Sequence, residues 1–295
     1  MSLTYRSYFG LRSDPFSTDV PTKDLLRLPG MIGVKDRLEY VINLGGVLVI
    51  TGEVGAGKST SLRWSLSHHH PSEVFIINVV ANSGSITELL RQICWGLDLI
   101  PKTISKSRLF ADAQTAIRSL AVSKKQKVSL IIDESNLLRP DVLTELHTLL
   151  HFDHDSKAHL SLVLCGQSTL LDRLSYRGAA PLASRVIAKA HLETLSQAQM
   201  EDYVDHHVKI SGGKKGLFDS PSITAIHQGS GGVLRRANAL ARGGLLAAAR
   251  EQKETVHAEH IRIAASELIL PSHQQRNLLC VQKIESIPCK KQISA

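Results

Sequence analysis

Residues 52–59 read Gly52-Glu53-Val54-Gly55-Ala56-Gly57-Lys58-Ser59 and fit G-x-x-x-x-G-K-[ST] at every specified position. Such a loop wraps backbone N–H groups around phosphates. The apolar run 47–51 enters the loop and predicts a buried strand, and residues 59–67 leave it with helical spacing. The helix dipole then favours the same negative charge. We therefore predict a nucleotide site formed by the eight loop residues and by Thr60, which starts the helix.

The residue types of this loop assign roles to two side chains. Lys58 is predicted to reach the β- and γ-phosphates, and the Ser59 hydroxyl to hold Mg²⁺. The alternative is a chance glycine-rich turn. All four specified positions and both flanks fit the loop, which argues against chance.

A second motif supports the first. Residues 127–134 form an apolar strand that ends in Asp133 and Glu134, as in a Walker B element. Asp133 is predicted to orient the Mg²⁺ shell and Glu134 to polarise the attacking water. Phosphoryl transfer asks a protein mainly for positioning and charge stabilisation, so these few groups suffice. The two motifs together predict ATP as the substrate and Mg²⁺ as the cofactor.

Composition favours a globular protein with one large and one smaller domain: 295 residues, 43% hydrophobic and 21% charged. We find no transmembrane-length apolar run and no apolar core of a signal peptide at residues 1–6. Four scattered cysteines lack metal-ligand spacing. These features predict a cytoplasmic location without a membrane partner. The net charge of +8 suits a polyanion partner, although 4% aromatic residues argue against base stacking.

The order of the elements predicts an α/β fold. Strands are expected at 47–51, 74–79, 128–132, 160–165 and 187–192. Helices are expected at 34–43, 59–67, 85–97, 107–123, 140–151 and 168–175. Alternation of this kind predicts a parallel five-stranded sheet flanked by helices, with nucleotide at the carboxyl ends of the strands.

After residue 195 only helices are expected, at 197–211, 222–228, 232–250 and 257–268, with Ser196 as an N-cap. We therefore divide the chain into four parts. These are an N-terminal segment (1–30), a P-loop α/β domain (31–194), a small all-helical lid domain (195–269) and a tail (270–295) that is flexible or binds a partner.

Residues 5–268 resemble the AAA+ ATPases of the ExeA type, a family first associated with the general secretion pathway, with similar proteins that accompany transposases. The segments that carry the resemblance are 8–16, 133–138, 162–167, 182–186 and 232–238. Their order and spacing make it specific. The resemblance implies an AAA+ P-loop NTPase fold and ATP hydrolysis.

The resemblance also implies further site residues. Gln167 takes the sensor 1 position on the γ-phosphate, and Arg235 the sensor 2 position, with Arg236 as the alternative if the register shifts by one. Arg185 resembles an arginine finger acting on a neighbouring subunit, which implies a homo-oligomer, ring or helical filament. Phe16 is expected near the adenine, with packing onto the core as an equal alternative.

Three functions are compatible with these residues. The leading hypothesis is an ATP-dependent regulator that oligomerises on duplex DNA, largely without sequence preference, and recruits or activates a DDE-type transposase or other transposition proteins, with hydrolysis driving disassembly. Its predicted DNA contacts are Lys102, Lys106 and Arg108. The alternative is an ExeA-type ATPase that assists assembly of a secretion system through protein partners. The secretion members carry a membrane segment and a wall-binding extension after the ATPase. We expect neither in this chain, which favours the transposition branch. A nucleotide switch with negligible hydrolysis is a third reading, which Glu134 disfavours.

Overall fold

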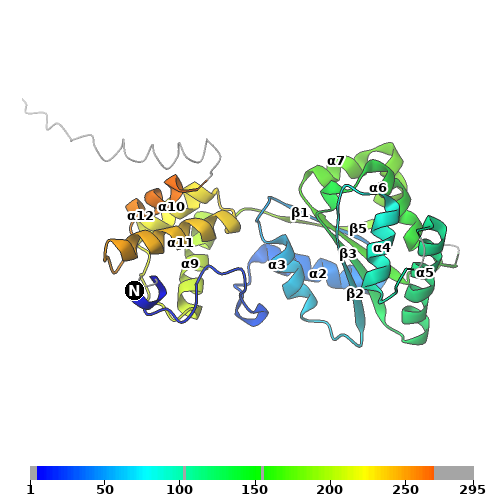
Figure 1. Ribbon diagram of the computed structural model, residues 1–295, viewed down its shortest axis with the longest axis horizontal. Helices are drawn as coiled ribbons and strands as arrows, with labels where there is room; N and C mark the ends of the chain where they lie inside the picture. The colour runs from blue at the N-terminus through cyan, green and yellow to red at the C-terminus, as the bar shows by residue number, and fades with distance from the viewer. Residues whose placement is uncertain (1–4, 102–103, 154–155, 269–295) are drawn as a thin grey trace, which may run out of the picture. The chain divides into compact units, whose positions relative to one another are not determined.

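Five parallel strands form the sheet that carries both motifs (Figure 1). The computed structural model describes residues 5–101, 104–153 and 156–268. The strands are β1 (Gly46–Gly52), β2 (Val74–Val80), β3 (Lys127–Asp133), β4 (Leu160–Gly166) and β5 (Val186–Leu192), in the order β2-β3-β4-β1-β5. Every pairing in the sheet is parallel. The predicted α/β fold is therefore confirmed, and each strand lies within one residue of its predicted bounds.

Helices cover both faces of the sheet, which explains why the central strands are apolar on both sides. One face packs against α2 (Pro29–Leu44) and α3 (Lys58–Leu66) through residues such as Val34, Leu38 and Leu62. The other face packs against a larger set of helices. That set comprises α4 (Ile86–Gly96), α5 (Lys106–Arg118), η2 (Ser119–Ser123), α6 (Pro140–Leu146), η4 (His147–Leu150), α7 (Thr169–Ser175), η6 (Arg177–Ala179) and α8 (Ala180–Ala183).

Two predicted helices change type along their length. The helix expected at 107–123 is α-helical only to Arg118 and continues as the π-helical turn η2. The helix expected at 140–151 is α-helical to Leu146 and then tightens into the 3-10 turn η4. Helix α2 begins at Pro29, five residues before its predicted start, because proline is well suited to the first turn of a helix.

The chain divides into two compact units, which we call the sheet unit (27–193) and the helical unit (1–26 with 194–295). The described helices of the second unit are α1 (Tyr5–Tyr8), η1 (Thr22–Asp24), α9 (Gln197–Ile210), α10 (Ser220–Ser230), α11 (Leu234–Arg250) and α12 (Ala258–Ser266). Ser196 caps α9 in a capping box with Gln199, as the sequence predicted for this residue.

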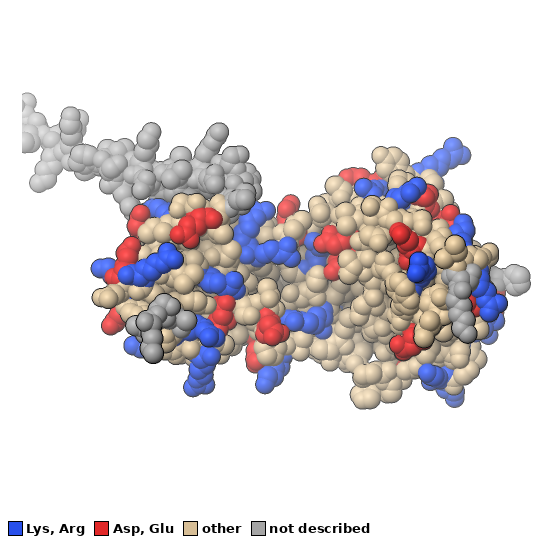
Figure 2. Space-filling model, in the orientation of Figure 1, with Lys and Arg blue, Asp and Glu red and all other residues tan. Residues whose placement is uncertain are grey.

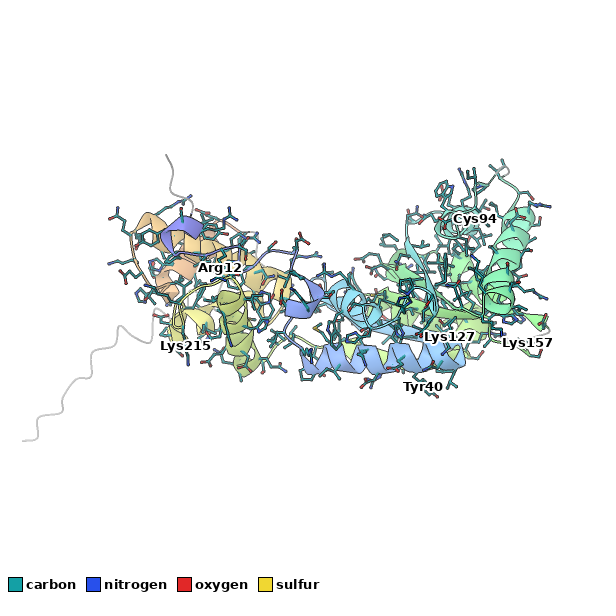
Figure 3. All side chains as sticks on the ribbon, turned by 90° about the horizontal axis from the view of Figure 1, so that it is seen from below. Arg12, Tyr40, Cys94, Lys127, Lys157 and Lys215 are labelled. Atoms are coloured by element: carbon teal, nitrogen blue, oxygen red, sulfur yellow. The ribbon has the colours of Figure 1, made fainter. Side chains whose placement is uncertain are left out.

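The described part of the N-terminal segment, from residue 5 to residue 26, packs onto the helical unit. The Arg12 N–H donates to the carbonyl of Ser211 at 2.9 Å, and Figure 3 labels Arg12 among the side chains of this unit. The Arg242 guanidinium forms an ion pair with Asp14 at 2.8 Å and donates to the Phe16 carbonyl. The boundary between the two units falls between residues 26 and 27. The division of the chain into four parts stays a prediction.

A buried histidine fixes the same segment to α9. His207 is 3% exposed and donates from Nδ1 to the Pro15 carbonyl at 2.7 Å. Its ring stacks on that of Phe16 at 6.1 Å between centroids. Burial lowers the pKa of His207 from 6.5 to about 4, and the bond to Pro15 opposes this only in part. The imidazole is therefore neutral in the folded helical unit at neutral pH.

This histidine makes the stability of the helical unit depend on pH. In the unfolded chain His207 is protonated as the pH falls below 6.5, whereas in the folded chain it is protonated only near pH 4. The contribution of neutral His207 to the free energy of unfolding is thus fully present above pH 6.5. It falls by up to about 3 kcal/mol as the pH drops from 6.5 to 4. Amide exchange in α9, measured from pH 4.5 to 7.5, should report this loss. His207→Gln should flatten the slope, and an unchanged slope would contradict the assignment.

Candidate functional site

The phosphate-binding loop joins β1 to α3 at the carboxyl edge of the sheet. Gly57 precedes the first residue of α3 with φ 93° and ψ 19°, a left-handed conformation that glycine adopts without strain. No side chain caps this helix end. The N–H groups in the first turn of a helix have no partner within the helix, so they are open to an anion. The loop therefore fits the phosphates predicted for it.

Lys58 lies folded over its own loop. Its ammonium donates to the carbonyls of Gly52 and Glu53, both at 2.9 Å, and the residue is only 7% exposed. These contacts hold the positive charge beside the loop that is predicted to surround the phosphates. A phosphate oxygen would compete with the two carbonyls for the same ammonium.

Ser59 and Asp133 bring the two motifs together. The Ser59 hydroxyl donates to Asp133 Oδ2 at 2.8 Å, although 74 residues separate them. The contact arises because β4 alone separates β1 from β3, so both motifs end at one edge of the sheet. A hydroxyl and a carboxylate are hard oxygen ligands, which Mg²⁺ takes together with water and substrate phosphates. The pair therefore fits the predicted magnesium ion. Within the described ranges no group of three or more His, Cys, Asp or Glu residues could hold a metal by itself.

Glu134 follows Asp133 in a left-handed turn, with φ 53° and ψ 33°. Its N–H donates to Asp133 Oδ1 at 2.8 Å. One oxygen of Asp133 is thus bound to Ser59 and the other to the turn that carries Glu134. The side chain of Glu134 is half-buried at this edge.

Gln167 lies at the end of β4, between the two motif strands. Its backbone N–H donates to Asn136 Oδ1 at 2.9 Å. The strand order therefore brings Gln167 to the same edge as Ser59 and Glu134. Asn136 was not singled out from the sequence, where it was only one letter of the segment that follows the Walker B strand.

A buried thiol lies beneath the Asp133 carboxylate. Cys165 is fully buried in β4. Burial raises the pKa of the Cys165 thiol well above its usual range, and the Asp133 carboxylate raises it further. The thiol is therefore neutral and adds no charge beneath the predicted magnesium site.

Arg185 lies at the opposite end of the sheet. Val186 pairs with Val47 and Leu192 with Gly52, so Arg185 precedes the amino end of β5. Its guanidinium donates to the Pro181 carbonyl at 3.1 Å and to His151 Nε2 at 2.8 Å. At roughly 3.3 Å per strand residue, Arg185 lies roughly 20 Å along the strand direction from the phosphate loop of its own subunit. Arg185 is therefore not part of the site in its own chain.

Three predicted nucleotide contacts belong to the helical unit. Arg235 is exposed in the first turn of α11, whereas the next residue, Arg236, donates to the Ser230 carbonyl at 3.2 Å. Phe16 is 1% exposed, with its ring against those of His207 and Phe218. Phe16 thus packs within the helical unit, and contacts of Phe16 or Arg235 with nucleotide stay predictions.

Two of the three predicted DNA contacts are paired with acids. Lys106 forms an ion pair with Glu145 at 2.9 Å, and Arg108 with Asp112 at 3.0 Å. Lys102 lies outside the described residues. Figure 2 shows basic and acidic side chains interspersed over the visible face of the sheet unit. Lys106 and Arg108 thus each have a carboxylate partner, and contacts of Lys102, Lys106 and Arg108 with DNA stay predictions.

This sheet order, the phosphate loop and the acidic pair Asp133 and Glu134 define a P-loop nucleoside triphosphatase of the AAA+ class. Residues 42–174 match the family model described as "AAA domain". The chain thus carries an AAA+ ATPase domain, as predicted. It is 31% identical over 268 residues to General secretion pathway protein A of Aeromonas hydrophila, covering 90% of this chain and 48% of that protein. The chain thus spans about half the length of this relative.

Solved structures agree on the fold. Cdc6p from Pyrobaculum aerophilum has a TM-score of 0.69 at 17% identity, covering 88% of this chain and 72% of that chain. Aeropyrum pernix ORC1, solved in complex with DNA, has a TM-score of 0.64 at 18% identity, covering 86% of this chain and 68% of that chain. The Thermotoga maritima RuvB branch migration motor has a TM-score of 0.52 at 14% identity, covering 84% and 72%. At these identities the likeness establishes the fold alone.

The sequence contains no apolar run of transmembrane length, and the helices of the structure bear on the same question. In the part of the chain that the structure describes, no helix combines the length and the hydropathy needed to cross a bilayer.

The lysine of the loop can be tested by binding. Lys58→Ala removes the ammonium that lies over the loop, so affinity for a non-hydrolysable ATP analogue should fall by about 10–100-fold, the loss of a charge-assisted contact. Titration calorimetry measures it. Lys124→Ala, an exposed lysine before β3, is the matched control and should bind as the parent chain does. Equal affinity of the two variants would remove Lys58 from the site.

Proposed function

We propose that this chain hydrolyses ATP with Mg²⁺ in a head-to-tail homo-oligomer and uses the cycle to assist assembly of a secretion system through protein partners. The contact of Ser59 with Asp133 carries the hydrolytic part of the proposal. It joins the end of the phosphate loop to the acidic end of β3, which the chemistry requires to be adjacent.

Each side chain then has a physical role. The loop N–H groups and Lys58 would bind the β- and γ-phosphates. Ser59 and Asp133 would hold Mg²⁺, which when bound neutralises phosphate charge. Glu134 would accept a hydrogen bond from the attacking water and orient it. Gln167, at the end of the intervening strand, would donate to the γ-phosphate or to that water.

Arg185 supports the oligomer. Because it precedes the amino end of β5, it is too far from the loop of its own sheet unit to reach the phosphates. If Arg185 acts on nucleotide bound to a second subunit, the surface that carries Arg185 in one subunit contacts a different surface, the nucleotide site, of the next. Such a heterologous interface generates a ring or a helical filament.

The choice of partner rests on sequence similarity. The 31% identity extends over 90% of this chain, including the helical unit, and the relative is named for the general secretion pathway. The paired state of Lys106 and Arg108 also weakens the case for a DNA-binding surface. Both observations favour protein partners.

A second candidate is the DNA-bound regulator of a transposase. The net charge of +8 favours it, and Aeropyrum pernix ORC1, which has the same fold, was solved in complex with DNA. On this reading ATP builds the oligomer on duplex DNA, and hydrolysis dismantles it.

Mixing two inactive variants tests the trans arginine. Glu134→Gln should bind ATP but lose about 10²–10⁴-fold in turnover, because the water is no longer activated. Arg185→Ala should lose about 10³–10⁵-fold, because transition-state charge is no longer neutralised. In a mixture, Arg185 from the first variant completes the intact sites of the second, so turnover should rise well above either alone. A mixture no faster than its components would contradict a trans arginine.

Duplex DNA distinguishes the two candidates. If proteins are the partners, ATP turnover and ATP-dependent sedimentation should change less than about twofold when duplex DNA is added at near-physiological salt. Salt-sensitive stimulation, lost in Lys106→Ala with Arg108→Ala but kept in Lys124→Ala, would instead favour the DNA-bound regulator.

A further inference from the structure

The turn after Asp133 is held in a conformation that needs support. Glu134 adopts positive φ, which costs a non-glycine residue free energy and persists only where neighbouring contacts fix it. Bonds within the turn supply part of that support. The Glu134 N–H donates to Asp133, and the Ser135 hydroxyl donates to the Ile132 carbonyl at 2.6 Å. These bonds do not tie the turn to the neighbouring strand β4.

Asn136 supplies that tie. Its side chain is buried, 6% exposed, and its Oδ1 accepts the N–H of Gln167 at 2.9 Å. One amide group therefore joins the turn that follows β3 to the first residue after β4. Without this acceptor, the partly buried N–H of Gln167 would lose its hydrogen bond to the turn.

The backbone of β4 is shaped to admit this side chain. A Cβ at Gly166 would lie 2.7 Å from Asn136 Oδ1 and 3.0 Å from the Asn136 nitrogen. Any side chain at residue 166 would therefore displace Asn136 from its bond to Gln167. The glycine and the asparagine fit together at the end of the strand.

A second bond holds the far end of the turn. Arg173, on α7, donates from Nη1 to the carbonyl of Leu138, which is 2% exposed. Helix α7 begins two residues after Gln167. The turn is thus fixed at Asn136 and at Leu138 to one continuous segment, 166–175. We call these two bonds the turn clamp.

We infer that Asn136 and Arg173 are positioning residues that keep Glu134 and Gln167 in a fixed relation through the turn clamp. The inference rests on the proposed function, in which these two residues act on one water and one phosphate from different strands. The two bonds of the clamp hold the turn that carries Glu134 against the segment that carries Gln167. Its loss should slow the chemical step and leave nucleotide affinity intact, because the phosphate loop is not part of it.

The main test substitutes Asn136→Leu, which has similar shape but no acceptor. We expect kcat to fall at least about tenfold, which corresponds to about 1.4 kcal/mol. The Kd for a non-hydrolysable ATP analogue should change less than about twofold. Amide exchange of the peptide containing Gln167 should accelerate. Asn78→Leu, the same substitution at an exposed position of β2, should match the parent chain in all three measurements.

A second disruption keeps Asn136 itself. Gly166→Ala should give the same three results, and Arg173→Met, which keeps the side-chain stem, should give a smaller fall in kcat. In the Gln167→Ala background the bond from Asn136 to the backbone N–H of residue 167 remains, but the side chain that it positions is absent. Asn136→Leu should therefore reduce kcat further by much less than it does alone.

Three results would overturn the inference. These are unchanged kcat in Asn136→Leu, nucleotide affinity falling in parallel with kcat, or full additivity with Gln167→Ala. Failure of the proposed function looks different. In that case Glu134→Gln and Gln167→Ala would leave turnover unchanged, while exchange at Gln167 would still report whether Asn136 holds that amide.

Discussion

The order of the strands in the parallel sheet is the constraint on which the site depends. With β4 between β1 and β3, the loop that follows one strand and the acids that follow another end at the same edge. The 2.8 Å contact of Ser59 with Asp133 is the direct result. The same order brings Gln167 between them and lets Asn136 reach its N–H. Burial on both faces fixes the register of these strands, because a slip would move apolar side chains out of the two cores.

The two ends of the sheet have different roles on the proposed assembly. The carboxyl edge carries the groups that bind and orient nucleotide, and the amino edge carries Arg185, which contacts His151 and Pro181 there. A parallel sheet separates these ends by the length of its strands, so one subunit cannot bring them together. On this proposal the site within each subunit is incomplete, so turnover would depend on assembly.

Charge composition proved a weaker guide than motif chemistry. The net charge of +8 suggested DNA, yet Lys106 and Arg108 each pair with a carboxylate in the sheet unit. Ion pairs between exposed groups contribute little to stability, but they do reduce the positive potential offered to a polyanion. The proposed secretion role rests instead on the 31% identity to General secretion pathway protein A. Formal charge describes a chain, whereas recognition depends on how the charges are arranged.

The sequence by itself determined the fold class, the strands, the nucleotide loop and the acids of the second motif. These follow from local apolar runs and from chemistry that requires fixed residue types at fixed spacing. It did not determine the attachment of the N-terminal segment to α9 through His207, the acid partners of Lys106 and Arg108, or the bond from Asn136 to Gln167. Most of these contacts join residues more than 30 positions apart, so they depend on strand order, register and packing. Only the folded chain brings such residues within hydrogen-bonding distance.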